Sequence, residues 1–111
     1  MSEIRRLIMD RRIFQRIRTN FDVDIKEPTM DSVYNGTTVD LSAGGISIDS
    51  SSQIKSKDKL DLWLKFPDGH QPFHTTGRPI WSEKNKADTW RTGIVFDNIR
   101  FMGLWRVFGP V

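Results

Sequence analysis

The chain has 111 residues, a formal net charge of +3, no cysteine and 12 aromatic residues. This length fits one domain with one hydrophobic core, and the lack of cysteine excludes a disulfide framework, a thiolate metal site and a thiol nucleophile. No apolar run approaches the roughly 20 residues that cross a bilayer, and residues 1–10 lack the apolar stretch of a signal peptide. We therefore expect a soluble, single-domain protein of the cytoplasm.

The excess positive charge is concentrated at the N-terminus. Residues 1–18 hold six arginines against Glu3 and Asp10, a local charge of +4, whereas the other 93 residues carry a charge of −1. An arginine guanidinium offers a planar fork for phosphate and a flat face that stacks on a base. A solvated basic segment is the ordinary alternative. We expect residues 1–13 to form a flexible arginine-rich arm, and residues 14–111 to form the folded domain.

Alternating apolar side chains predict a series of short strands. The first covers residues 17–26 and ends before Pro28, because proline cannot donate a hydrogen bond to a sheet. Asn35-Gly36 indicates a tight turn. Further strands are expected over residues 37–41, 45–49, 60–66, 73–81 and 90–97. The tripeptide Pro67-Asp68-Gly69 is expected to form the turn of a hairpin.

The spacing of apolar residues becomes helical near the C-terminus. Phe101, Leu104, Trp105 and Phe108 lie at i, i+3, i+4 and i+7, which predicts an amphipathic helix over residues 98–108. Several short strands followed by one helix favour a mainly β fold. The predicted architecture is a small six-stranded antiparallel β-barrel with a C-terminal α-helix and an arginine-rich N-terminal arm.

Residues for catalysis or metal binding are sparse. His70 and His74 are the only histidines, and Pro72 between them argues against a helix. On a strand, residues four apart lie about 13 Å from each other, too far to share one metal ion. No nucleophile elbow, phosphate-binding loop or dinucleotide fingerprint occurs. We expect no enzymatic activity, no metal and no cofactor.

Two short motifs stand out. The first is Arg-x-x-x-Arg, formed by Arg12 and Arg16, with Arg11 as an additional arginine. The second is Asp-x-Ser-x-x-Gly, formed by Asp40, Ser42 and Gly45 at the corner between two predicted strands. In this order and strand context the sequence resembles the PilZ domain, the bacterial receptor module for cyclic di-GMP. The segments 77–81 and 92–96 are similar to two further strands of that family.

The resemblance implies a PilZ-like barrel that binds cyclic di-GMP as its ligand through Arg11, Arg12, Arg16, Asp40, Ser42 and Gly45. The arginines would bind phosphate, a guanine edge or a base face. Asp40 would accept hydrogen bonds from a guanine, and Ser42 would bond locally or to the ligand. Gly45 would let the backbone approach a base or adopt a positive φ.

One residue departs from the family pattern. Pro79 stands where the family usually has valine, in the segment that ends at Trp81. Proline costs a ladder hydrogen bond, so we expect an edge or a bulge at this point.

Three alternatives remain open at this stage. The arginines and the Asp-x-Ser-x-x-Gly motif are, taken singly, ordinary surface charges and a polar turn. A PilZ-like domain without ligand that acts through protein contacts is the second alternative. The third is a small barrel that binds single-stranded nucleic acid, although residues 19–111 are slightly acidic. An effector protein or domain is the expected partner, and a homodimer is an option. The pathway and the ligand stoichiometry stay open.

Overall fold

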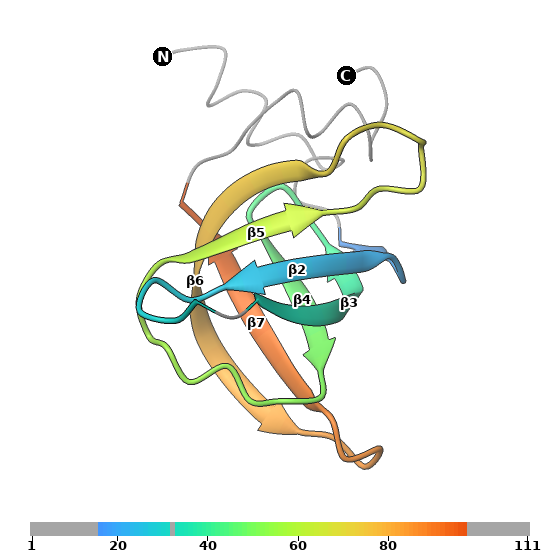
Figure 1. The fold of residues 1–111 in the computed structure, drawn as a ribbon. Helices are drawn as coiled ribbons and strands as arrows, with labels where there is room; N and C mark the ends of the chain where they lie inside the picture. Colours follow the sequence, from blue (N-terminus) through green and yellow to red (C-terminus); the bar gives the residue numbers. More distant parts are fainter. Residues whose placement is uncertain (1–15, 32, 98–111) are drawn as a thin grey trace, which may run out of the picture.

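The computed structural model describes residues 16–31 and 33–97 of the chain, and the structural statements below concern these residues. They form seven strands: β1 (Ile17–Arg18), β2 (Asp22–Lys26), β3 (Val33–Leu41), β4 (Gly45–Ser50), β5 (Leu60–Leu64), β6 (Phe73–Lys84) and β7 (Trp90–Phe96). Figure 1 shows β2 and β5 crossing in front of β4 and β7.

The strands close into an antiparallel barrel. Neighbouring strands follow the order β1-β3-β2-β5-β6-β7-β4, and β4 also pairs with β3, which closes the ring of six strands β2 to β7. The two residues of β1 attach to the end of β3, where Ile17 lies opposite Leu41. The predicted six-stranded antiparallel barrel is therefore confirmed, with β1 as a short addition to it.

The barrel interior is filled by branched aliphatic side chains. Residues of β2, β4, β5 and β7 alternate inward and outward, and Ile25, Ile48 and Leu62 have no exposed surface. Burying each such side chain contributes about 1.5–3 kcal/mol relative to an exposed one. One end of the interior is aromatic, with the rings of Phe21 and Phe66 4.9 Å apart. The outer faces are left for charged and polar residues.

The predicted single strand over residues 17–26 is two strands in the structure. Its apolar alternation continues without a break, but the hydrogen-bonding partner on β3 changes along the way. β1 pairs with Asp40 and Leu41, and β2 pairs with residues 33–37. Between them, Phe21 donates its N–H to the hydroxyl of Thr38 at 3.0 Å. Periodicity predicts which side chains share a face and carries no information on such a change of partner.

The predicted turn at Asn35-Gly36 is wrong. Both residues lie inside β3, where Gly36 is opposite Val23 of β2 and Ser50 of β4. A Cβ at Gly36 would lie 2.7 Å from Cγ2 of Ile48. This glycine therefore allows a close approach within the barrel, which a dipeptide turn signal cannot distinguish from a hairpin.

The hairpin between β5 and β6 and the strand near residues 90–97 are confirmed. Leu64 pairs with Phe73, and Gly69 in the connection has a φ of +78°. The register between β6 and β7 shifts between Pro79 and Trp81. The bulge expected at Pro79 is therefore confirmed as well.

The predicted fold class was wrong in adding a C-terminal α-helix to the barrel. The described residues contain strands and no helix, and the segment 98–108 lies outside them. Helical spacing shows only which side chains would share a face, and isolated helices shorter than about 12–15 residues are marginal in water. The arm over residues 1–13 also lies outside the described residues. No helix in the described part of the chain is long and apolar enough to span a membrane.

Candidate functional site

The corner between β3 and β4 holds the Asp-x-Ser-x-x-Gly motif in a tight, buried turn. Ser42 donates its backbone N–H to the carbonyl of Gly45 at 2.9 Å, and its hydroxyl lies 3.5 Å from the same carbonyl oxygen. Phe96 of β7 donates its N–H to the carbonyl of Gly44. Ser42 is only 6% exposed. The corner is therefore a fixed element, which hydrogen bonds from β7 hold in place.

Arg16 brings the two sequence motifs together. The pairing of β1 with β3 places Arg18 opposite Asp40, so the chain just before β1 runs beside the corner. The guanidinium of Arg16 lies 3.1 Å from Oδ1 of Asp40 and donates a hydrogen bond of 3.3 Å to the hydroxyl of Ser42. Asp40 Oδ1 is buried and accepts no well-aligned hydrogen bond within the described residues, so its contact with Arg16 is an ion pair.

The remaining predicted site residues divide into two groups. Arg11 and Arg12 lie outside the described residues. Gly45 begins β4 and does not have the positive φ that was expected as one option. Among the described glycines, Gly69 has a positive φ. A Cβ at Gly45 would lie 2.5 Å from the carbonyl oxygen of Ile94. The absence of a side chain at Gly45 therefore lets β7 pair closely with β4 beside the corner.

An open pocket of about 460 Å³ lies beside Asp40 on the outside of the barrel. It is lined by Arg18, Thr19, Thr38, Val39, Asp40, Asp49 and Arg91. Two guanidinium groups and two carboxylates therefore face one cavity, next to the guanidinium of Arg16. Such an arrangement fits a polar ligand that carries both negative charge and hydrogen-bond donors.

Asp49 and Arg91 form an ion pair with two hydrogen bonds in the pocket. They lie opposite each other on β4 and β7, and Arg91 donates from Nε at 2.8 Å and from Nη2 at 3.0 Å. Asn85 adds a hydrogen bond of 3.1 Å to Asp49. Hydrogen bonding by Arg91 lowers the pKa of Asp49, and the same bond raises the pKa of Arg91. Both groups therefore stay charged across the physiological range.

Trp81 extends this side of the barrel. The register aligns Asp40, Ser47, Gly93 and Trp81 in one row across β3, β4, β7 and β6. The indole lies against Gly93, since a Cβ there would collide with ring atoms of Trp81. We call the surface formed by Asp40, Asp49, Trp81, Arg91 and Gly93 the β4–β7 face.

Sequence reasoning missed Arg18, Asp49 and Arg91 as neighbours of the motif. Arg18 lies two residues after Arg16, the end of the first motif, and the sequence indicates it only as part of the basic N-terminus. Asp49 and Arg91 are 42 residues apart, and only the pairing of β4 with β7 places them together. The alternation of β4 gave a usable signal, because a carboxylate two residues from Ser47 must point to the same face.

The histidines and carboxylates show no metal centre in the described part of the chain, where no three such residues cluster. His74 pairs with Asp61 at 2.8 Å on the outside of β5 and β6, away from the corner. His70 lies in the connection before β6.

The described strands form a small closed antiparallel barrel with a polar pocket beside the corner of β3 and β4. The PilZ domain family model matches residues 10–101, and the chain therefore belongs to the PilZ domain family. This match includes both motifs and all strands of the barrel. No curated protein sequence matches the chain.

Solved structures share the fold at low sequence identity. The inhibitor of motility MotI/DgrA from Bacillus subtilis is 17% identical with a TM-score of 0.68, covering 90% of this chain and 49% of that one. The chain thus spans about half the length of MotI/DgrA. The PilZ domain of YcgR from Escherichia coli, solved with c-di-GMP, is 16% identical with a TM-score of 0.66 and 89% coverage of both chains. PlzA from Borreliella burgdorferi, in complex with c-di-GMP, is 19% identical with a TM-score of 0.62, covering 95% of this chain and 43% of that one.

Proposed function

We propose that this chain is a receptor domain for cyclic di-GMP and acts as a binding module rather than an enzyme. Membership of the PilZ family supports this, as does the ligand named for the YcgR and PlzA structures. The observation on which the proposal rests is the position of Arg16, whose guanidinium contacts both Asp40 and Ser42. Arg16 of the first motif thereby lies beside Asp40 and Ser42 of the second at the corner of the barrel.

The chemistry of the site suits a nucleotide with two phosphates and two guanines. Arg16 is half exposed, so its guanidinium is accessible to a phosphate or to the O6/N7 edge of a guanine. Asp40 is an acceptor, and the N1 and N2 donors of a guanine are its natural partners. We infer that binding exchanges the ion pair between Arg16 and Asp40 for contacts with the nucleotide. Gly45 contributes by holding β7 close to the corner.

The N-terminal arm is the proposed output element. Arg11 and Arg12 belong to the first motif, and both would add cations to the same ligand. We infer that residues 1–13 become ordered on the barrel when the nucleotide binds, and that a partner protein or domain recognises the ordered arm. Amide hydrogen exchange of the arm with and without saturating ligand tests this step. Equal exchange in both states contradicts it.

The cytoplasm is the proposed location, because the proposed nucleotide ligand is an intracellular signal. The ligand binds either as a monomer or as a stacked dimer, and titration distinguishes the two by stoichiometry. A homodimer of the receptor remains an option to be tested by its mass in solution.

Calorimetric titration with cyclic di-GMP tests the proposed function. We expect a Kd in the micromolar range or tighter, about −8 kcal/mol or more. Arg16→Ala removes the contact with both motif residues and is expected to weaken binding at least tenfold, and the double change Arg12→Ala, Arg16→Ala to abolish it. Lys65→Ala is the matched control, because Lys65 pairs with Asp24 on the outside of β2 and β5.

The contradicting outcomes are specific. No heat at millimolar nucleotide overturns the receptor proposal and favours a PilZ domain that acts through protein contacts alone. Steeply salt-dependent binding to single-stranded oligonucleotides without preference for the cyclic dinucleotide selects the nucleic-acid alternative.

A further inference from the structure

Strand β6 has an unpaired edge over its second half. On one side β5 pairs with residues 73–77 only, whereas on the other side β7 pairs along the strand as far as Lys84. From Arg78 to Lys84 the edge that faces away from β7 therefore has no neighbouring strand within the described residues. An unpaired edge offers a row of backbone donors and acceptors to an extended chain.

The register identifies which backbone groups point outward. Hydrogen-bonded and non-hydrogen-bonded pairs alternate in an antiparallel ladder. Asn85 donates its N–H to the carbonyl of Thr89 at 2.7 Å, so Lys84 and its partner Trp90 form a non-hydrogen-bonded pair. By alternation the same holds for Ser82. Ser82 and Lys84 therefore direct their N–H and C=O groups away from β7, and no described residue bonds to them.

Part of this edge is protected and part is not. Pro79 has no N–H, and the bulge between Pro79 and Trp81 interrupts the regular spacing. Proline and bulges are the usual protections of natural strand edges. Ser82 and Lys84, beyond the bulge, keep both donors. The free segment is short, and this suits one short peptide rather than a second sheet.

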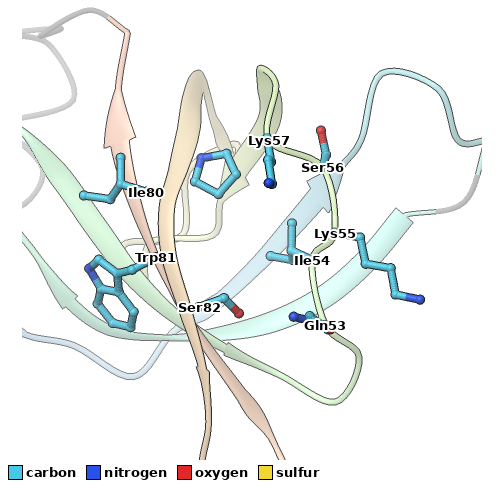
Figure 2. Close-up of a pocket in the computed structure, with 9 residues that line it drawn as sticks. Gln53, Ile54, Lys55, Ser56, Lys57, Ile80, Trp81 and Ser82 are labelled. Atoms are coloured by element: carbon cyan, nitrogen blue, oxygen red, sulfur yellow. The ribbon is translucent and has the colours of Figure 1, made fainter.

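A groove runs along this edge. It has a volume of about 370 Å³ and lies between β6 and the connection from β4 to β5. Its lining consists of Gln53, Ile54, Lys55, Ser56, Lys57, Pro79, Ile80, Trp81 and Ser82. In Figure 2, Ile54 points from the loop toward β6 and Ser82 faces Gln53, whereas Ile80 and Trp81 project from the other side of β6.

The groove is apolar at its base and positively charged at its rim. Ile54 is 4% exposed and belongs to the core, and it forms an apolar base together with Pro79. Lys55 and Lys57 are exposed, and no carboxylate is among the described lining residues. Charge complementarity therefore favours an acidic occupant with apolar side chains at alternate positions.

We propose that the edge of β6 and this groove bind an extended acidic segment of a partner protein by strand addition. The segment pairs its backbone with Ser82 and Lys84, directs apolar side chains to Ile54 and Pro79, and places carboxylates near Lys55 and Lys57. This site differs from the corner with Arg16, so the proposal does not depend on the identity of the nucleotide.

The test uses a fluorescent nine-residue peptide of alternating valine and glutamate and the full chain. Fluorescence anisotropy measures binding, and amide hydrogen exchange measures the protection of Ser82 and Lys84. We expect saturable binding and slower exchange at both amides. Two control peptides are expected not to bind. One has lysine in place of glutamate, and the other has proline at alternate positions.

Variants separate this site from the nucleotide site. The double change Lys55→Glu, Lys57→Glu is expected to weaken peptide binding about tenfold through charge repulsion, and Lys59→Glu, in the same loop but outside the lining, is the matched control. Ser82→Pro removes an outward N–H that the barrel does not use and is expected to abolish peptide binding, with the melting temperature as a check of folding. Arg16→Ala is expected to leave peptide binding unchanged.

Three results overturn the proposal. The first is unchanged exchange at Ser82 and Lys84 in the presence of bound peptide. The second is equal binding of the acidic and the basic peptide. The third is protection of these amides that rises with protein concentration without peptide, which would assign the edge to a second copy of the chain. Each result leaves the titration with cyclic di-GMP unaffected.

Discussion

The β4–β7 face and the outside of β2 and β5 both display a tryptophan among charged side chains, yet the two arrangements differ. We call the second surface, formed by Asp24, Asp61, Trp63, Lys65 and His74, the β2–β5 face. There each carboxylate contacts a basic side chain nearby: Asp24 pairs with Lys65 at 3.1 Å, and Asp61 lies 2.8 Å from Nε2 of His74. The indole of Trp63 packs beside the ring of His74 at 5.1 Å.

On the β4–β7 face a glycine occupies the position beside the tryptophan. The indole of Trp81 lies against Gly93, and Arg18 lines the adjoining pocket without an ion pair among the described residues. The indole thus fills the space that a side chain at position 93 would take, and Arg18 gives the adjoining pocket a cation with no carboxylate partner among the described residues. Composition alone would not separate the two faces, because both contain tryptophan, carboxylates and cations.

The largest expected effect is at the corner of the β4–β7 face. Gly45→Ala places a Cβ against the carbonyl oxygen of Ile94, and backbone cannot move aside as a side chain can. We expect the free energy of unfolding to fall by roughly 1–3 kcal/mol in urea denaturation. Gly44→Ala is the control, since its Cβ would meet nothing within 4 Å. Equal effects of both changes would contradict the close approach of β7.

The ion pair of Asp49 and Arg91 gives a pH-dependent effect. Its hydrogen bonds lower the pKa of Asp49 below the ordinary value of 3.8, so the stabilisation is complete above that pH and is lost as the pH falls through the lowered pKa. Because both side chains are partly exposed, Asp49→Asn is expected to cost only about 1 kcal/mol at neutral pH. Denaturation curves at pH 7 and pH 2.5 measure the difference, which should be smaller at the lower pH. In an Arg91→Met background the change should be neutral at both values.

The contact between Trp81 and Gly93 is expected to have a smaller effect. Gly93→Ala displaces an exposed indole that can rotate away, so the loss of stability should be about 1 kcal/mol or less. Tryptophan fluorescence is expected to shift to longer wavelength as the indole becomes more exposed. In a Trp81→Ala background the same change should have no effect. A persisting loss there would place the strain in the backbone of β7.

The smallest expected effect is on the β2–β5 face. Lys65 and Asp24 form a single exposed ion pair, so Lys65→Ala should change the free energy of unfolding by less than about 0.5 kcal/mol. Thermal unfolding at low and high salt measures it. A loss as large as that of Asp49→Asn would remove the distinction between the two faces.

Much of the fold was predictable from local patterns, and the errors have physical causes. The strands near residues 60–66, 73–81 and 90–97 follow from alternating side chains, and the bulge follows from the covalent limits of Pro79. The turn assigned to Asn35-Gly36 was wrong, since a glycine that allows tight packing of strands leaves the same local signal as one in a hairpin. The helix over 98–108 was inferred from spacing alone, with no indication of a surface for it to pack on.

The part of the candidate site that was predictable is the part formed by the two sequence motifs. Asp40, Ser42 and Gly45 form one corner, and Arg16 lies beside it because β1 pairs with β3. The walls of the pocket were not predictable. Asp49 and Arg91 meet only through barrel closure, and no single-sequence pattern connects two strands that are so far apart.

Closure of the barrel through β4 and β7 also bears on how the protein folds. Asp49 and Arg91 are separated by 42 residues, and β5 and β6 lie between them in the chain. Pairing of distant strands is slow, because chain entropy is lost before any contact compensates for it. During synthesis β3, which carries Asp40, leaves the ribosome well before β7, which carries Arg91. A ligand that needs both would bind only the finished barrel, and its binding would then protect newly made molecules from unfolding and proteolysis.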